Sequence, residues 1–268
     1  MSEFKVSKHN AQLAAARSVI SKSGKSPREL GKESRLNILE WLYRWGFTSS
    51  SVGQLFLGRT SGGYLQKLAN QGWLVSTKTK SGTPAAYFTL SQIGLQEAER
   101  SANILCKYSE IDSYKVDQSK IRHYLIAQTS TINALRTGFI ADYGTERMFG
   151  VGGDKLGVKR PDVVWVTPTG FRYGIEVELS AKWERQLDDF VLKVIRALKS
   201  NGDNIPEFSR FVIVSDSPAI INRYSTAMQS GQPLAIWEKS DRGHWVIQKT
   251  IRVPDWLINK VDFQLIES

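Results

Sequence analysis

Two glutamates separated by a single residue, Glu176 and Glu178, have the clearest chemical meaning in this chain of 268 residues. They lie at the end of a segment, residues 172–179, whose composition predicts a β-strand. Because successive side chains of a strand alternate between its faces, both carboxylates point the same way and Val177 points to the opposite face. Two carboxylates this close repel each other in a low dielectric unless they share a proton or a divalent cation. Oxygen ligands of this kind favour Mg²⁺ or Mn²⁺.

A third acid, Asp162, precedes a second predicted strand over residues 163–167. The segment Pro168-Thr169-Gly170 predicts a tight turn between this strand and the one that carries the two glutamates. An antiparallel hairpin would bring Asp162 opposite the Glu178 end, so we expect three acidic groups close together and predict a metal site. The alternative is a solvated sheet face on which the acids pair with basic neighbours, namely Lys159, Arg160 and Arg172.

Lys182 is the basic residue expected nearest to these acids. It is predicted to begin a helix over residues 182–199 directly after the acidic strand, where its ammonium group can orient an attacking water or stabilise charge that develops on a phosphate. Lys193 lies on the same predicted helix and is the alternative candidate. Since a helix rises 1.5 Å per residue, Lys193 is about 16 Å further along, and this distance favours Lys182.

The elements predicted around these residues follow the order helix, three strands, helix, strand. This order indicates a domain of mixed α and β structure, of the α+β or α/β class, over residues 111–268. No apolar run reaches the roughly 20 residues needed to cross a bilayer, so we expect no membrane span. The elements are predicted at residues 121–136 (helix), 139–147, 163–167 and 172–179 (strands), 182–199 (helix), 211–214 (strand), 217–228 (helix) and 234–237 (strand).

Residues 33–110 predict a smaller domain with the order of a winged helix-turn-helix. Helical periodicity starts at Arg35, Ser51 is expected to cap a second helix, and Thr60 is expected to start a third helix that contains Gly62 and Gly63. Two strands over residues 73–75 and 87–90 then form a basic hairpin. A further helix over residues 91–107 either leads to the second domain or mediates formation of a homodimer. Residues 1–32 are predicted to form an arm and linker.

The net charge of +10 indicates a polyanionic partner. Residues 1–110 contain 15 lysines and arginines and 7 acids, a balance of +8, whereas residues 111–268 contain 21 and 19, a balance of +2. Attraction to phosphates is therefore expected mainly from the N-terminal domain, which favours DNA as its partner. The alternative is a winged helix used for protein contact.

Seven residues of the N-terminal domain are the predicted DNA contacts. Those on the third predicted helix would read base edges, and the others would bind phosphates. The first group is Thr60, Ser61, Tyr64 and Lys67, and the second is Arg59, Lys78 and Lys80.

The cysteine and histidine contents exclude several classes of site. The single cysteine, Cys106, excludes intramolecular disulfides and CxxC zinc motifs, and it fits a reducing, cytoplasmic location. The three histidines are scattered, which argues against nicking enzymes whose metal lies on closely spaced histidines. His123 is expected to pack or to form a hydrogen bond rather than to act as a base, and from its helix it could reach the sheet edge.

The order αβββαβ over about residues 120–214, with Asp162 and Glu176 at the expected places, resembles the PD-(D/E)XK restriction-endonuclease superfamily. In that superfamily the aspartate and the first acid of the (D/E)XK triplet hold the metal. Glu178 departs from the pattern, since it stands where the superfamily has lysine.

A narrower resemblance accounts for this departure. A winged helix followed by Glu146, Arg160-Pro161-Asp162 and the segment from Glu176 to Lys182 looks like the replication-relaxation proteins and the MOBC class of plasmid relaxases. The resemblance implies an enzyme that nicks one DNA strand at a plasmid transfer origin, with other relaxosome or conjugation proteins as partners. It implies that Asp162, Glu176 and Glu178 are ligands of Mg²⁺ or Mn²⁺, that Lys182 is the catalytic lysine and that Glu146 is an auxiliary acid. The alternatives are a related nuclease that cuts both strands and a non-enzymatic DNA-binding protein or replication regulator.

Overall fold

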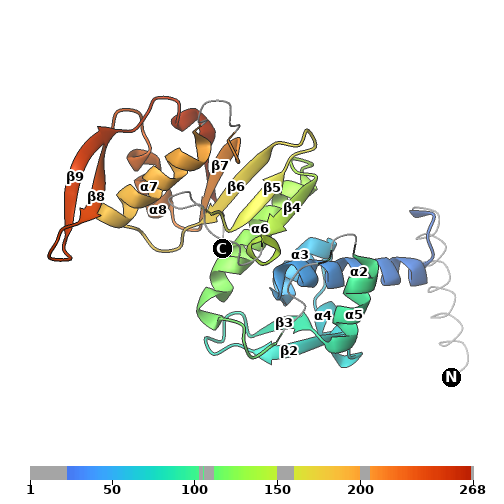
Figure 1. Ribbon diagram of the computed structural model, residues 1–268. Coiled ribbons are helices and arrows are strands. Elements are labelled where there is room, and N and C mark those ends of the chain that lie inside the picture. The colour runs from blue at the N-terminus through green and yellow to red at the C-terminus, as the bar shows by residue number, and fades with distance from the viewer. Residues whose placement is uncertain (1–22, 103–104, 106–111, 150–159, 200–205, 267–268) are drawn as a thin grey trace, which may run out of the picture. The chain divides into compact units, whose positions relative to one another are not determined.

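The computed structural model describes residues 23–102, 105, 112–149, 160–199 and 206–266. The chain forms two compact units, Met1–Lys115 and Val116–Ser268, and both combine helices with sheets, so the mixed α and β class is confirmed (Figure 1). Residues 1–22 of the predicted arm and residues 106–111, where the domain boundary was predicted, lie outside the described residues. None of the helices described is long and apolar enough to cross a membrane.

The first unit begins with a long helix, α2 (Pro27–Trp45), which starts eight residues before the predicted Arg35. The Ser26 side chain accepts a hydrogen bond from the Glu29 backbone, and the Glu29 side chain accepts one from the Ser26 backbone. This capping box, together with proline at the first helical position, sets the start of the helix. The prediction of a linker up to residue 32 was therefore wrong for residues 27–32.

Two short helices follow, and both begin at other residues than predicted. Ser49, not Ser51, caps α3 (Ser50–Leu57), because its side chain accepts from the Val52 backbone N–H at 3.2 Å. α4 (Tyr64–Asn70) begins only after Gly63, whose φ of 87° lies in the left-handed region that favours glycine. The prediction that Thr60 starts this helix was wrong because Gly62 and Gly63 interrupt it.

A three-stranded sheet completes the first unit. The strands β2 (Leu74–Lys78) and β3 (Ala86–Leu90) form the expected antiparallel hairpin. The short strand β1 (Thr48–Ser49), which the sequence did not predict, pairs with the other edge of β3, so the order is β1-β3-β2. The last helix, α5 (Gln92–Ser101), packs against α2.

The second unit is built on a five-stranded sheet in the order β10-β7-β6-β5-β4. An antiparallel meander runs through β4 (Asp142–Thr145), β5 (Val163–Val166) and β6 (Arg172–Val177). The strands β7 (Arg210–Ser215) and β10 (Val261–Leu265) continue the sheet in parallel with β6. The predicted order of helix, three strands, helix and strand is therefore observed, whereas β10 was not predicted.

Helices cover both faces of this sheet. α6 (Ile121–Arg136) lies on the face that carries Trp165, whose indole N–H donates to Thr131 at 3.0 Å. α7 (Glu184–Leu198) and α8 (Pro218–Ala227) pack on the opposite face, around Phe211 and Ile213. A hairpin of β8 (Pro233–Lys239) and β9 (Trp245–Arg252) forms a separate two-stranded sheet (Figure 1). Short 3-10 helices at Gln118–Lys120, Glu146–Phe149 and Ile258–Lys260 complete the unit.

Candidate active site

The two glutamates of the sequence motif lie at the end of β6, on the face covered by α7 and α8. Glu176 is opposite Ile213 of β7, and the Glu178 backbone N–H extends the parallel pairing by donating to the Val214 carbonyl at 2.9 Å. The alternation along β6 places both side chains on one face, as predicted. Both glutamates are buried, with exposed fractions of 5% and 3%. Two carboxylates on one buried face require compensating positive charge or protons.

Lys182 supplies positive charge to this pair. Its ammonium group forms an ion pair with the Glu178 carboxylate, and it lies 5.0 Å from the centre of the Phe190 ring. The prediction that Lys182 lies on the helix was wrong. It lies in the loop before α7, because α7 begins at Glu184 after Trp183. The predicted reach of the ammonium group back to Glu178 is nevertheless present.

The alternative lysine lies elsewhere. Lys193 is on α7 and forms an ion pair with Asp189 of the same helix at 2.8 Å. Of the two candidates, only Lys182 is paired with a carboxylate of the β6 motif.

Tyr224 of α8 joins the same cluster, and sequence reasoning missed it. Burial raises the pKa of the Tyr224 hydroxyl, and the negative charges of Glu178 and Glu176 raise it further. The phenol therefore remains neutral beside the two acids. The sequence offered one indication of Tyr224, namely a tyrosine at an apolar position of the predicted helix. We call Glu176, Glu178, Lys182 and Tyr224 the carboxylate–lysine cluster.

Asp162 lies in a bend just before β5, and its carboxylate is held by two groups. Its Oδ2 atom accepts a hydrogen bond from the Val177 backbone N–H at 2.8 Å and lies 3.1 Å from Nε2 of His123 on α6. His123 therefore reaches the sheet edge and contacts an acid there, as a hydrogen-bonding residue would.

Glu146 and Tyr124 lie in the same neighbourhood. The Tyr124 hydroxyl donates to the Glu146 carboxylate at 2.7 Å. Burial raises the pKa of Tyr124, and the hydrogen bond to Glu146 and the charges of Glu146 and Asp162 raise it further. We call Asp162, His123, Tyr124 and Glu146 the aspartate–histidine cluster.

The two clusters divide the three acids that the sequence predicted together. Asp162 is a bend residue, so strand alternation does not fix its direction, and its carboxylate turns to the backbone of Val177 and to α6. Among the residues that the structure describes, no three His, Cys, Asp or Glu side chains are close enough together to hold a metal ion. The predicted three-carboxylate metal site is therefore not assembled in this part of the chain.

The donor chemistry of the glutamate pair still fits a hard cation. Mg²⁺ is usually bound by one or two protein carboxylates, and water and substrate phosphates supply its other ligands. Glu176 and Glu178 provide two such carboxylates on one face. Binding of Mg²⁺ or Mn²⁺ at this pair stays a prediction.

The predicted DNA contacts of the first unit are exposed, apart from Tyr64. Thr60 and Ser61 lie in the turn before α4, and Lys67 lies on α4 itself. Tyr64 is half-buried, and the Arg59 guanidinium lies 3.9 Å from the centre of its ring. In the β2–β3 hairpin, Lys78 ends β2 and Lys80 lies in the turn.

Comparisons with protein families, with curated proteins and with solved structures find no match to this chain. The function must therefore be inferred from the geometry of its own residues.

Proposed function

We propose that this protein binds DNA through its first unit and cleaves one strand of it with its second unit. The observation that carries the proposal is the buried pair Glu176 and Glu178, with the Lys182 ammonium group on one of the two carboxylates. Buried acids are costly to keep ionised, and a pair of them beside a lysine is therefore a candidate functional site.

The arrangement of the elements supports the proposal. In the second unit, α6, the meander of β4, β5 and β6, α7 and the parallel strand β7 follow the αβββαβ order of PD-(D/E)XK nucleases. Asp162 precedes β5 and Glu176 lies on β6, the two places at which that superfamily has its metal-binding acids. In the first unit, three helices and a hairpin follow the order of a winged helix.

The chain's own residues suit phosphodiester cleavage. Glu176 and Glu178 would hold Mg²⁺ or Mn²⁺, with Asp162 as a further ligand if its carboxylate turns toward them. When bound, such a cation would neutralise phosphate charge and activate a water molecule. The Lys182 Nζ atom would stabilise negative charge on the phosphate. The neutral Tyr224 phenol would help to keep this site dry, and His123 would hold the Asp162 carboxylate in place.

The first unit would bring the substrate to this site. Arg59, Lys67, Lys78 and Lys80 would contact phosphates, and Thr60, Ser61 and Tyr64 would lie near base edges. In the proposed role of a plasmid relaxase, the DNA is a transfer origin in the cytoplasm, and other relaxosome or conjugation proteins are partners.

Incubation of supercoiled plasmid with the protein and Mn²⁺ or Mg²⁺ tests the proposal. We expect open circles with the wild type and none with the Glu176→Gln variant, while both proteins retain DNA binding. Glu207→Gln is the matched control, because Glu207 is an exposed glutamate of the same unit that pairs with Arg172. Full nicking by Glu176→Gln would refute the assignment, and linear product from the wild type would indicate a nuclease that cuts both strands.

A second candidate function is a DNA-binding protein without cleavage activity. The engagement of Asp162 by His123 and the Val177 backbone favours it, because this carboxylate then does not lie with the glutamate pair. DNA binding by the wild type with no open circles in either metal would select this alternative.

A further inference from the structure

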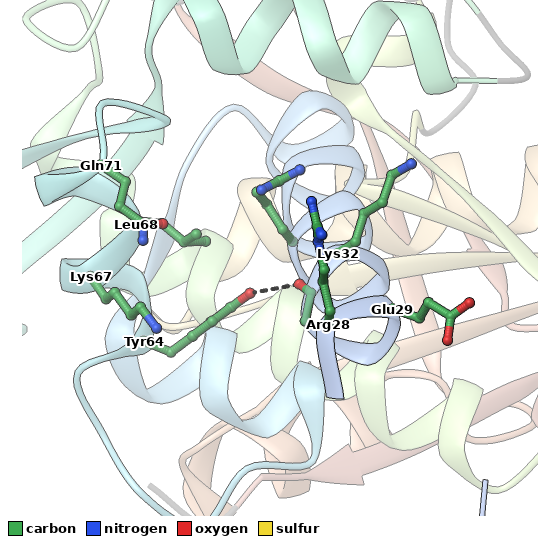
Figure 2. Close-up of a pocket in the computed structure, with 9 residues that line it drawn as sticks. Arg28, Glu29, Lys32, Tyr64, Lys67, Leu68 and Gln71 are labelled. Carbon is green, nitrogen blue, oxygen red and sulfur yellow. Dashed lines mark hydrogen bonds between the residues drawn. The ribbon is translucent and has the colours of Figure 1, made fainter. Parts of the chain in front are cut away.

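A hollow of about 510 Å³ lies between α2 and α4 of the first unit, and its lining is strongly basic. Figure 2 shows side chains from the two helices on opposite sides of this hollow. None of the α2 side chains there belongs to the predicted DNA contacts. The polar residues used below are Arg28, Lys32, Arg35, Tyr64, Lys67 and Gln71.

Three of the four cations come from one face of α2, and the fourth comes from α4. Arg28, Lys32 and Arg35 are spaced by four and three residues, which places them on one face of α2. Lys67 and Gln71 have the same four-residue spacing at α4 and its C-cap. We call these residues the basic hollow.

The acids near the basic hollow do not neutralise it. Glu29 also lines the hollow, but its carboxylate accepts a hydrogen bond from the Ser26 backbone N–H at 2.7 Å, and Figure 2 shows it pointing away from Tyr64 and Lys67. Glu33, the next acid of α2, pairs with Lys25 at 2.6 Å. In the described part of the chain, no carboxylate forms an ion pair with Arg28, Lys32, Arg35 or Lys67.

Arg35 adds a guanidinium to the lining of the hollow. Its guanidinium lies over the Trp73 ring, with the Cζ atom 4.5 Å from the ring centre, which is within the range of a cation–π contact. The Nε atom of Arg35 is buried, and no acceptor among the described residues takes its hydrogen.

We infer that the basic hollow binds phosphate groups of the DNA backbone. Several cationic donors with no carboxylate partner select an anion with several acceptor oxygens, and a guanidinium matches the geometry of phosphate. The stripe from Arg28 to Arg35 extends about 10 Å along α2. A row of this length suits successive phosphates of a strand better than a single small ion.

The hollow also continues the surface already proposed for DNA. Tyr64 and Lys67 line it and belong to the helix whose contacts with DNA were predicted. The Tyr64 hydroxyl donates to the Gly31 carbonyl at 3.4 Å and so links α4 to α2 (Figure 2). This inference rests on the proposed DNA-binding function and extends the contact surface to α2.

The test is the salt dependence of DNA binding by the full-length protein, measured by fluorescence anisotropy with a labelled duplex of 30 base pairs. Arg28→Gln/Lys32→Gln removes two exposed cations of the hollow, and we expect its slope of log K against log salt to fall by about two units. Lys25→Gln/Arg100→Gln is the control with the same loss of charge, since both residues pair with glutamates. We expect a change of less than one unit for the control.

Other outcomes would refute either this inference or the proposed DNA binding. An unchanged slope for the Arg28 and Lys32 variant, with a reduced slope for Lys78→Gln, would overturn the inference and leave the proposed DNA binding intact. If the wild type did not bind the duplex at all, the proposed DNA binding would fail, and this inference with it. Calorimetric titration with inorganic phosphate distinguishes DNA phosphates from free phosphate as the ligand of the hollow. If the wild type binds inorganic phosphate, the double variant does not, and the salt slopes of the two proteins for DNA are equal, the DNA assignment is overturned in favour of free phosphate.

Discussion

Replacing Lys182 with methionine should destabilise the second unit, because Glu178 would lose its counter-charge while it remains buried. Removal of one partner from a fully buried ion pair costs about 3–5 kcal/mol. The side chains of Lys182 and Glu178 are 33% and 4% exposed, so water already screens the lysine end of this pair. We therefore expect a loss of about 1–3 kcal/mol in the free energy of unfolding.

The reverse substitution should be milder. In Glu178→Gln the remaining ammonium group can turn to solvent, and the repulsion between Glu178 and Glu176 is removed. Urea denaturation followed by tryptophan fluorescence measures both changes. The Lys182→Met/Glu178→Gln double variant should be more stable than Lys182→Met alone, since it contains no unpaired buried carboxylate at position 178.

The matched control is Lys193→Met on α7, whose ion pair with Asp189 is exposed and should contribute no more than about 0.5 kcal/mol. If Lys182→Met cost no more than this control, or less than Glu178→Gln, the assignment of Lys182 as the counter-charge of a buried acid would be refuted. With the proposed function, Lys182→Met should also lower the nicking rate by about 10²- to 10⁴-fold.

Four further results are expected. Lys78→Gln should lower the salt slope of DNA binding by about one unit, whereas Lys249→Gln in the second unit should leave it unchanged. The raised pKa of Tyr224 means that, above about pH 10, the folded state keeps a proton that the unfolded state releases, so the free energy of unfolding should fall as the pH rises. Urea denaturation at pH 9–11 should show a smaller fall for Tyr224→Phe than for the wild type. Gly94→Ala should cost about 1–3 kcal/mol, because a Cβ atom at this position would lie 2.1 Å from a backbone carbonyl oxygen. Gly31→Ala on α2, where a Cβ atom meets nothing within 4 Å, should instead raise the thermal midpoint.

Local patterns in the sequence predicted much of this fold. The period of two along β6 was sufficient to place Glu176 and Glu178 on one face, and the β2–β3 hairpin followed from its turn residues. The predicted start of α7 was wrong because Trp183 makes no side-chain cap hydrogen bond, so the sequence there contains no signal for the beginning of a helix. The predicted start of α2 was also wrong, although a signal is present there. The capping box at Ser26 lies inside a segment whose composition resembles a linker.

Features that depend on distant parts of the chain were beyond such reasoning. The strand β10 pairs with β7 across about 50 residues, and nothing in its own five residues fixes that partner. The contacts of His123 with Asp162 and of Tyr124 with Glu146 join α6 to the sheet edge, and they depend on how that helix packs. Tyr224 reaches the carboxylates only because α8 covers the same face as α7.

The hydrogen bond from the Val177 backbone to Asp162 has a mechanical consequence. Val177 stands between the two glutamates of the carboxylate–lysine cluster, yet its N–H is held by a residue of the aspartate–histidine cluster. A rotation of the Asp162 side chain would release this amide, and the end of β6 would lose one of its anchors. The rate of hydrogen exchange at the Val177 amide would thus report whether a change in the Asp162 side chain on the α6 side of the sheet loosens the strand end that carries Glu176 and Glu178 on the other side.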